Sequence, residues 1–410
     1  MDSFKTLDDF VFKGKKVLVR IDVNSPLDKK DLRIKDDSKI ASSVPTLREL
    51  VDKGAKIAVM AHQGRKDHWD YTDLSQHATI LSKHLGAEVR YVDDLCGDVA
   101  KAAINSLSNG EVILLKNVRC FPEEDHKMTP EHHAKGELVQ HLAPLFDIFI
   151  NDAFASAHRS HASLVGFTMV LPSGAGRLLE KEIASLTKIV ESPRRPAVFV
   201  FGGTKFIDSL PIVRHLLAAG IADTVILGGL VGLAYLAASG REVGTESLKI
   251  LEHELTTEHT DEAKEILNEF GREIELPIDV AMDSGGSRIE APLGGDMPPH
   301  PALDIGSKSM ERFGEILSKA KTILISGPVG MFEREEFSLG TRVIFEKSIS
   351  SGAFCIIGGG HTTAAANQMG FAQRISYIST GGGALEHFLL GKPLPVVDAL
   401  KQAAARHGIA

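Results

Sequence analysis

The chain has 410 residues, of which 43% are hydrophobic and 24% are charged. This length exceeds what one hydrophobic core usually serves, and the composition is that of a globular protein, so we expect two domains. The 46 basic and 54 acidic residues give a net charge of −8, which argues against a general nucleic-acid or membrane surface. Three cysteines without a C-x-x-C pair, and an acidic N-terminus without a signal-peptide core, favour a cytoplasmic location.

The first half of the chain alternates β-branched runs with helical segments. In the run KVLVRIDVNSP (16–26), apolar residues fall on one face, whereas Arg20, Asp22 and Asn24 fall on the other. Charged residues at the end of an apolar strand are costly unless they bind a ligand or form a salt bridge. Taken alone, this strand leaves both a structural Arg20–Asp22 pair and a binding role open.

Three further runs end in the same way. They are AKIAVMAHQGR, EVILLKNVR and FDIFINDAFASAHRSH. Because ligands bind outside the carboxyl ends of parallel strands, one edge of this sheet should gather basic side chains. Those side chains are His62, Arg65, Arg119 and Arg159, beside Asp22 and Asn24. Guanidinium groups bind phosphate and carboxylate in bidentate fashion, so the set predicts a site for a small polyanion, although any one arginine could form a salt bridge instead.

The middle of the chain, 172–196, reads PSGAGRLLEKEIASLTKIVESPRRP. Its apolar residues recur at helical spacing between proline and glycine boundaries, which predicts a connecting helix. The uncharged stretch 224–240 approaches the length of a membrane span, but its glycines favour a buried strand followed by a helix.

The strands of the second half run into glycine-containing turns. The runs are AVFVFGGTKF, TVILGG, KTILISGPVGMFE, AFCIIGGGHTTAAANQ and ISYISTGGGALEHF. Glycine lets the backbone approach a ligand, and helix N-termini offer free N–H groups, so these turns predict a phosphate-binding surface. Neither standard nucleotide fingerprint is present. Glu333 could bind ribose hydroxyls or could be a first-turn helix carboxylate, and the histidine spacings predict no structural metal.

Six blocks together resemble the phosphoglycerate kinase family, in order and over essentially the whole chain. They are VLVRIDVNSP, NDAFASAHRSH, FGGTK, GPVGMFE, IIGGGHT and STGGGA, and HTTAA after the triple glycine resembles the archaeal branch. The resemblance implies an α/β fold of two doubly wound, Rossmann-like parallel-sheet domains joined by a central hinge helix. We expect a 3-phosphoglycerate-binding domain over 1–172, a hinge over 173–192, a nucleotide-binding domain over 193–392, and a C-terminal segment, 393–410, that packs back near the first domain.

The resemblance further implies reversible transfer of the ATP γ-phosphoryl group to the carboxylate of 3-phosphoglycerate, giving 1,3-bisphosphoglycerate, with Mg²⁺ carried on ATP or ADP. The implied acceptor site comprises Asp22, Asn24, Lys39, His62, Gln63, Gly64, Arg65, Arg119 and Arg159. The implied nucleotide site comprises Gly202, Gly203, Lys205, Gly228, Gly330, Glu333, Gly358, Gly359, Gly360, His361 and Thr362.

The implied mechanism is electrostatic. Lys39, Lys205 and the backbone N–H groups of Gly359, Gly360 and Gly382 would stabilise the transferring oxygens. The acceptor carboxylate is already ionised, so no general base is needed. Because the two surfaces lie on different domains, the chemistry would require closure about the middle helix.

Several positions depart from the family pattern. Lys39 stands where the family has an essential arginine, with Arg33 nearby in a different register, and lysine lacks the planar fork of arginine. Ser209 replaces a second lysine, Lys116 a glutamate and Ser326 an asparagine. His361 stands where many members have a magnesium-binding aspartate, so no protein ligand is assigned to the metal.

Three alternatives stay open. The chain could be a weakly active or inactive relative that binds both ligands, a same-fold kinase for another phosphorylated acid, or a nicotinamide dehydrogenase. The missing dinucleotide fingerprint speaks against the last. We expect no nucleic-acid or membrane partner, and a monomer or homodimer.

Overall fold

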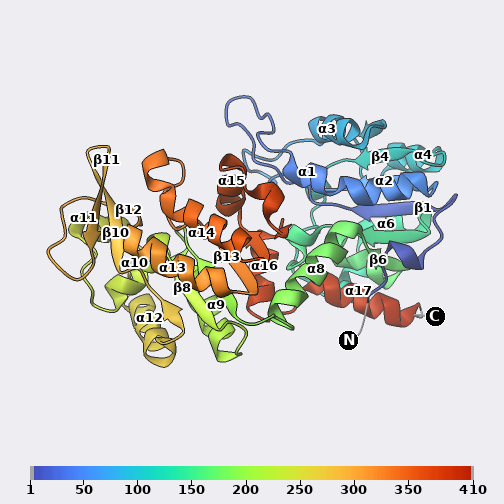
Figure 1. Ribbon diagram of the computed structural model, residues 1–410. Helices are drawn as coiled ribbons and strands as arrows, with labels where there is room; N and C mark the ends of the chain where they lie inside the picture. The colour runs from blue at the N-terminus through green and yellow to red at the C-terminus, as the bar shows by residue number, and fades with distance from the viewer. Residues whose placement is uncertain (1–3, 408–410) are drawn as a thin grey trace. The chain divides into compact units, whose positions relative to one another are not determined.

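The computed structural model describes residues 4–407 and divides into two compact units. The first unit comprises the chain up to Ala184 together with the chain from Pro393 onward, and the second runs from Ser185 to Lys392. Both units combine parallel strands with helices (Figure 1), as the predicted α/β class requires. Residues 408–410, the end of the predicted C-terminal segment, lie outside the described residues.

The first unit is built on a six-stranded parallel sheet in the order β3-β4-β2-β1-β5-β6. Its strands are β1 (Lys16–Arg20), β2 (Lys56–Met60), β3 (Val89–Val92), β4 (Val112–Leu115), β5 (Ile148–Asn151) and β6 (Ser173–Ala175). The helices of this unit are α1 (Ser38–Ser42), α2 (Val44–Asp52), α3 (Ser75–Leu85), α4 (Asp98–Asn105), α5 (Pro130–Ala134), α6 (Glu137–Leu142), α7 (Ala162–Val165) and α17 (Pro395–Arg406).

This sheet is buried on both faces, which explains why its strands read as nearly continuous apolar runs. Val17 and Val19 of β1 belong to a core that includes Leu47 of α2. Leu18 points to the opposite core, which includes Ile104 of α4. The strand alternation predicted from the sequence therefore places successive residues of β1 in different cores.

The second unit has its own six-stranded parallel sheet, in the order β15-β14-β13-β7-β8-β9. Its strands are β7 (Ala197–Phe201), β8 (Thr224–Leu227), β9 (Ile274–Glu275), β13 (Thr322–Ser326), β14 (Phe354–Gly358) and β15 (Tyr377–Ile378). The helices are α9 (Phe206–Ala218), α10 (Gly229–Ala238), α11 (Thr245–Leu251), α12 (Thr257–Phe270), α13 (Ser307–Lys319), α14 (Leu339–Ser350), α15 (Gly360–Gln368) and α16 (Gly382–Leu389).

The uncharged stretch 224–240 forms β8 and α10, the strand and helix that its glycines predict. Val225, Ile226 and Leu227 are fully buried in this unit. Across residues 4–407, no helix combines the length and the apolar character needed to cross a membrane.

A small antiparallel sheet in the second unit was not predicted. It consists of β11 (Ser287–Pro292), β10 (Asp279–Ser284) and β12 (Ala302–Ile305), in that order. Gly285 and Gly286 connect β10 to β11 with φ angles of +60° and +95°, a conformation that favours glycine in a hairpin turn.

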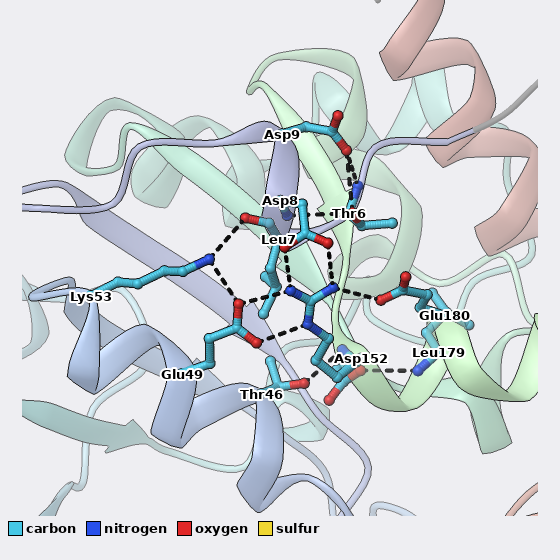
Figure 2. Close-up of polar contacts among 11 residues, drawn as sticks. Thr6, Leu7, Asp8, Asp9, Thr46, Glu49, Lys53, Asp152, Leu179 and Glu180 are labelled. Atoms are coloured by element: carbon cyan, nitrogen blue, oxygen red, sulfur yellow. Dashed lines mark hydrogen bonds and ion pairs between the residues drawn. The ribbon is translucent and has the colours of Figure 1, made fainter.

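Helix α8 (Arg177–Val190) begins at a dense polar anchor in the first unit. Asp8, Glu49 and Glu180 converge there (Figure 2) on the guanidinium of Arg177, with N–O distances of 2.6, 2.8 and 2.9 Å. The backbone N–H of Leu179 donates to the buried Asp152 at 3.0 Å. The division between the units falls within α8, after Ala184. Residues 173–175, which we assigned to the hinge, instead form β6 of the first sheet because they pair with β5.

Candidate active site

The first unit gathers polar side chains at the carboxyl ends of four adjacent strands, in the order β4-β2-β1-β5. Asp22 and Asn24 follow β1, His62 follows β2, Arg119 follows β4 and Arg159 follows β5. Because the strands are parallel, these ends lie at the same edge of the sheet. We call Asp22, Asn24, Lys39, His62, Arg65, Arg119 and Arg159 the basic cluster.

Asp22 is the carboxylate at the centre of this cluster. It is buried, accepts a hydrogen bond from the Ser156 hydroxyl at 2.9 Å, and lies 4.0 Å from Nζ of Lys39. Burial alone would raise its pKa, but the positive charges of Lys39 and its other basic neighbours hold the pKa of Asp22 well below its usual range. Asp22 is therefore ionised and partly neutralises the cluster.

Asn24 and Gln63 hold the loops after β1 and β2 together. Gly64 N–H donates to Asn24 Oδ1 at 2.9 Å, and the backbone N–H of Ser25 donates to Gln63 Oε1 at 2.9 Å. Gly64 has φ of +65°, and a Cβ there would lie 2.2 Å from the carbonyl oxygen of Asp70. The side chain of Gln63 is thus engaged within the protein, since its Nε2 also donates to the Ser25 carbonyl at 3.1 Å.

The arginines supply positive charge that the protein does not fully balance. Arg119 is buried and donates to the Gly64 carbonyl, and burial together with the charges of Arg159 and Arg20 lowers its pKa. Arg65 is exposed, and Arg159 is half-buried. Cations that repel one another in a partly buried site are stabilised by a bound anion. The basic cluster therefore has the charge needed to bind one.

Two positions that depart from the family pattern, Lys39 and Lys116, lie in this unit. Arg33 pairs with Asp31 on an exposed loop, whereas Lys39 reaches Asp22, so Lys39 is the cation that belongs to the cluster. Lys116 forms an exposed ion pair with Asp93 at 3.1 Å.

The second unit contains a cavity of about 480 Å³, a size suited to a small ligand. The glycine turns after β7 and β13 and the first residues of α15 and α16 line it. Of the predicted nucleotide residues, the wall includes Gly202, Gly203, Lys205, Gly330, Glu333, Gly359, Gly360, His361 and Thr362, and it also includes Gly382.

The turns after β7 and β13 pack backbone against backbone. Gly327 has φ of +99°, and a Cβ there would lie 2.2 Å from the carbonyl oxygen of Gly202. The Gly327 N–H donates to the Thr362 hydroxyl at 2.8 Å, which joins the turn to α15. At Gly360 and Gly382, by contrast, a Cβ would meet no atom within 4 Å. The N-termini of α15 and α16 therefore offer accessible donors for phosphate oxygens.

Lys205 is held at this wall by carboxylates that sequence reasoning did not identify. Its Nζ lies 2.8 Å from Glu386 and 3.6 Å from Asp208, and the hydrogen bond with Glu386 raises the pKa of the lysine. The Lys205 side chain is 66% exposed, so a ligand can reach it. Ser209, at the position of the family's second lysine, is buried and donates to the Phe206 carbonyl, so it offers no charge to a ligand.

The cavity wall also carries an apolar group, which the sequence analysis missed. Pro277, Val280 and Leu303 line the cavity together with Ile250. Ile250 comes from α11, whereas the other three lie in or just before strands of the small antiparallel sheet, so this wall depends on tertiary contacts rather than on a local motif. An apolar surface beside these glycine turns suits the planar base of a nucleotide.

Gly228, Gly358 and Glu333 differ in their surroundings from what the sequence indicates. Gly228 and Gly358 do not line the cavity: a Cβ would lie 2.6 Å from Val329 at Gly228 and 2.1 Å from Leu385 at Gly358. Both therefore serve close packing, and their neighbours Gly229 and Gly359 face the cavity. Glu333 lies in a turn rather than in the first turn of a helix, so the structural alternative proposed for it is wrong.

The residues of the cavity fit a magnesium ion that arrives with a nucleotide. Mg²⁺ prefers oxygen ligands and usually combines one or two carboxylates with phosphates and water. Asp208 and Glu386 supply such carboxylates in the wall, whereas His361 packs edge-on against Phe332. Between residues 4 and 407, no group of three or more histidines, cysteines or acidic residues could hold a metal by itself.

Comparison with known proteins places the chain in a family. The family model described as phosphoglycerate kinase matches residues 7–392. The chain belongs to the phosphoglycerate kinase family. Its archaeal relatives include the phosphoglycerate kinase of Methanothermus fervidus, 42% identical over 99% of both chains, and that of Methanosarcina mazei, 45% identical over 98% of this chain and 96% of the relative.

Solved phosphoglycerate kinases share the fold. The enzyme from Pyrococcus horikoshii OT3 superposes with a TM-score of 0.91 at 38% identity, covering 99% of this chain and 100% of the other. That from Coxiella burnetii gives 0.83 at 30% identity, covering 98% and 99%. The phosphoglycerate kinase architecture of two parallel-sheet domains, predicted from the sequence blocks, is confirmed.

Proposed function

We propose that this chain catalyses reversible transfer of the ATP γ-phosphoryl group to the carboxylate of 3-phosphoglycerate, giving ADP and 1,3-bisphosphoglycerate. The observation that carries the proposal is that the two units have different kinds of binding surface. One collects incompletely balanced cations at a sheet edge, and the other has a glycine-lined cavity with accessible helix N-termini. Family membership over nearly the whole chain supports this reaction.

In the first unit, the basic cluster would hold the acceptor. Arg65, Arg119 and Arg159 suit the phosphate, because guanidinium groups bind such oxygens with paired N–H donors. His62 and Asn24 would contact the part of 3-phosphoglycerate between its phosphate and its carboxylate. Asp22, as an ionised carboxylate, would accept a hydrogen bond from a ligand hydroxyl group and would repel any anionic group beyond those two. Lys39 would face the carboxylate that accepts the phosphoryl group.

In the second unit, the cavity would hold the nucleotide. The turns at Gly202–Gly203 and the starts of α15 and α16 suit its phosphates, and the apolar wall suits its base. Glu333 would accept hydrogen bonds from the ribose hydroxyls. Mg²⁺ bound with the phosphates would neutralise charge, and Asp208 and Glu386 are the carboxylates we assign to its surroundings.

The chemistry needs positioning and charge stabilisation rather than proton transfer. The acceptor carboxylate is ionised at neutral pH, so we assign no general base. Lys39 and Lys205, with the N–H groups of Gly359, Gly360 and Gly382, would stabilise the transferring oxygens. Lys205 must exchange part of its contact with Glu386 for a phosphate oxygen. The reactants bind to different units, so the transfer requires that those two surfaces meet. Free cysteines and the absence of net positive charge fit a cytoplasmic location.

ADP production by the purified protein with MgATP tests the proposal. Turnover should be confined to 3-phosphoglycerate when it is compared with 2-phosphoglycerate and glycerate. Equal turnover with another phosphorylated acid would assign a different substrate. No turnover, with both ligands still bound in calorimetry, would show an inactive relative.

A further inference from the structure

A buried polar chain runs beneath the basic cluster and ends at His62. Arg20 Nε donates to Ser163 Oγ at 2.9 Å, and that hydroxyl donates to Glu124 Oε1 at 2.7 Å. At the other side of the guanidinium, Arg20 Nη2 lies 2.9 Å from Nδ1 of His62. Arg20, Ser163 and Glu124 are at most 1% exposed, so none of them can serve as a ligand contact on the surface.

The chemistry of the guanidinium fixes the protonation of the imidazole. Arginine only donates hydrogen bonds, so Nδ1 of His62 must accept and cannot carry a proton. A neutral imidazole then carries its proton on Nε2. Burial, only partly opposed by Asp22, lowers the pKa of His62 well below its usual value, and the charges of Arg20, Arg119 and Arg159 lower it further. His62 is therefore a neutral donor through Nε2.

Glu124 anchors the end of this hydrogen-bonded series that lies opposite His62. Its Oε2 accepts from the Ser163 backbone N–H at 2.8 Å, and its carbonyl accepts from Ala162 N–H at 3.1 Å. Glu124 lies in the loop that follows Arg119, whereas Ser163 follows Arg159. The carboxylate thus ties the loop after Arg119 to α7, the helix that follows Arg159. It also supplies opposite charge near the buried guanidinium, which would otherwise be costly to bury.

We propose that Glu124 and Ser163 are positioning residues that hold Arg20 against His62, so that the acceptor meets His62 as a neutral Nε2–H donor. This inference rests on the proposed acceptor site, where His62 contacts the ligand. Without the Ser163 hydroxyl or the Glu124 charge, Arg20 is still held by the Ile21 carbonyl but no longer at Nε, so its guanidinium can turn away from Nδ1. His62 then samples both tautomers, and acceptor binding weakens while nucleotide binding in the second unit does not.

The test uses the full chain with ¹⁵N-labelled histidine and the variants Ser163→Ala and Glu124→Gln. Glu123→Gln is the matched control, because it removes the same charge one residue earlier, outside the chain described above. The resonances of His62 are assigned by their loss in His62→Asn. Between pH 6 and 8 the parent protein should show an unprotonated Nδ1 and a protonated Nε2. Both test variants should show mixed tautomers and a KM for 3-phosphoglycerate raised about tenfold, with an unchanged KM for MgATP.

The inference is overturned if His62 keeps its single tautomer in both variants, or if the KM values for both substrates rise together as in general destabilisation. Ser163→Ala removes one hydroxyl and decides the question even if Glu124→Gln does not fold. The His62→Asn variant separates this inference from the proposed function. If it leaves the KM for 3-phosphoglycerate unchanged, the acceptor site is wrongly assigned, whereas the tautomer spectra still report on the polar chain.

Discussion

Lys39 is the residue whose identity departs most consequentially from the family pattern. Its side chain is 33% exposed and its Nζ lies 4.0 Å from Asp22, which places a positive charge at the proposed acceptor site without the planar fork of arginine. We expect Lys39→Ala to lower kcat by about 10²–10³, as loss of one oxyanion donor does. Lys39→Arg should change kcat less than about tenfold, because the stabilisation is mainly electrostatic.

Steady-state kinetics in the forward and reverse directions measure both effects. Arg33→Ala is the control, since Arg33 pairs with Asp31 on an exposed loop and its loss should leave kcat unchanged. A gain of 100-fold or more in Lys39→Arg would contradict the expectation and show that the parent chain is a weakened enzyme.

At the residue scale, the sequence predicts which side chains lie at strand ends better than it predicts the packing and polar contacts that those side chains make. His62, Arg119 and Arg159 could be placed together because a parallel sheet brings its carboxyl ends to one edge. Gly229 lines the cavity and the predicted Gly228 does not, because strand-end glycines look alike until the packing of Gly228 against Val329 is known. Glu386, Glu124 and Ser163 were missed because their partners are distant in sequence: Glu386 meets Lys205 181 positions away.

At the scale of one element, the first turn of α8 donates a hydrogen bond to a carboxylate in an unusual state, that of Asp152 directly after β5. Asp152 is fully buried and accepts from the Leu179 N–H (Figure 2). Burial raises its pKa to about 7, and the hydrogen bonds from Thr46 and the helix backbone only partly offset that effect. In the unfolded chain the same group titrates near its ordinary value of 3.8.

This difference predicts a pH dependence of stability. Because the folded-state pKa of Asp152 is raised, its contribution is fully present below about pH 4 and is lost as pH rises through about 7. The total loss amounts to at most about 4 kcal/mol, from about 1.4 kcal/mol per pKa unit. Asp152→Asn has no such titration, so its free energy of unfolding should gain on that of the parent protein between pH 4 and 7, and the gain should level off above 7.

Urea unfolding followed by tryptophan fluorescence measures this quantity. The single tryptophan, Trp69, lies in the first unit with Asp152, so it reports on the relevant part of the chain. Asp304, whose pKa burial also raises to about 7, is present in both proteins and cancels in the comparison. Parallel pH profiles for parent and variant would show that Asp152 is ionised in the folded state.

Among elements, regular alternation was predictable and irregular pairing was not. The runs that became β1, β7 and β14 end in distinctive residues, and their β-branched content marks them as buried parallel strands. Ser173–Ala175 contains no β-branched residue, so the sequence favours the hinge there, and only pairing with β5 makes this segment the strand β6. The hairpin of β10 and β11 turns at Gly285–Gly286, a glycine pair that is typical of hairpin turns.

At the scale of the whole molecule, each proposed ligand has its contacts within one unit. The basic cluster comes from the chain before Ala184, and every residue of the cavity wall comes from the second unit. Binding of either proposed ligand is therefore expected to stabilise only the unit that contacts it. A ligand that binds only the native form stabilises it by about 2.7 kcal/mol at 100 times its Kd.

Hydrogen exchange detected by mass spectrometry should resolve this division. Near saturation, 3-phosphoglycerate should slow amide exchange in the strands and loops of the basic cluster by up to about 100-fold, and MgADP should do so for the turns around Gly202 and Gly327 and for α15. Arg119→Ala should remove the protection given by 3-phosphoglycerate while leaving that of MgADP, and Lys205→Ala should weaken the protection given by MgADP alone. The contrary result is that either ligand alone slows exchange in both units and still does so in these variants. The two units would then respond as a single cooperative unit, and one ligand site could not be assigned to each.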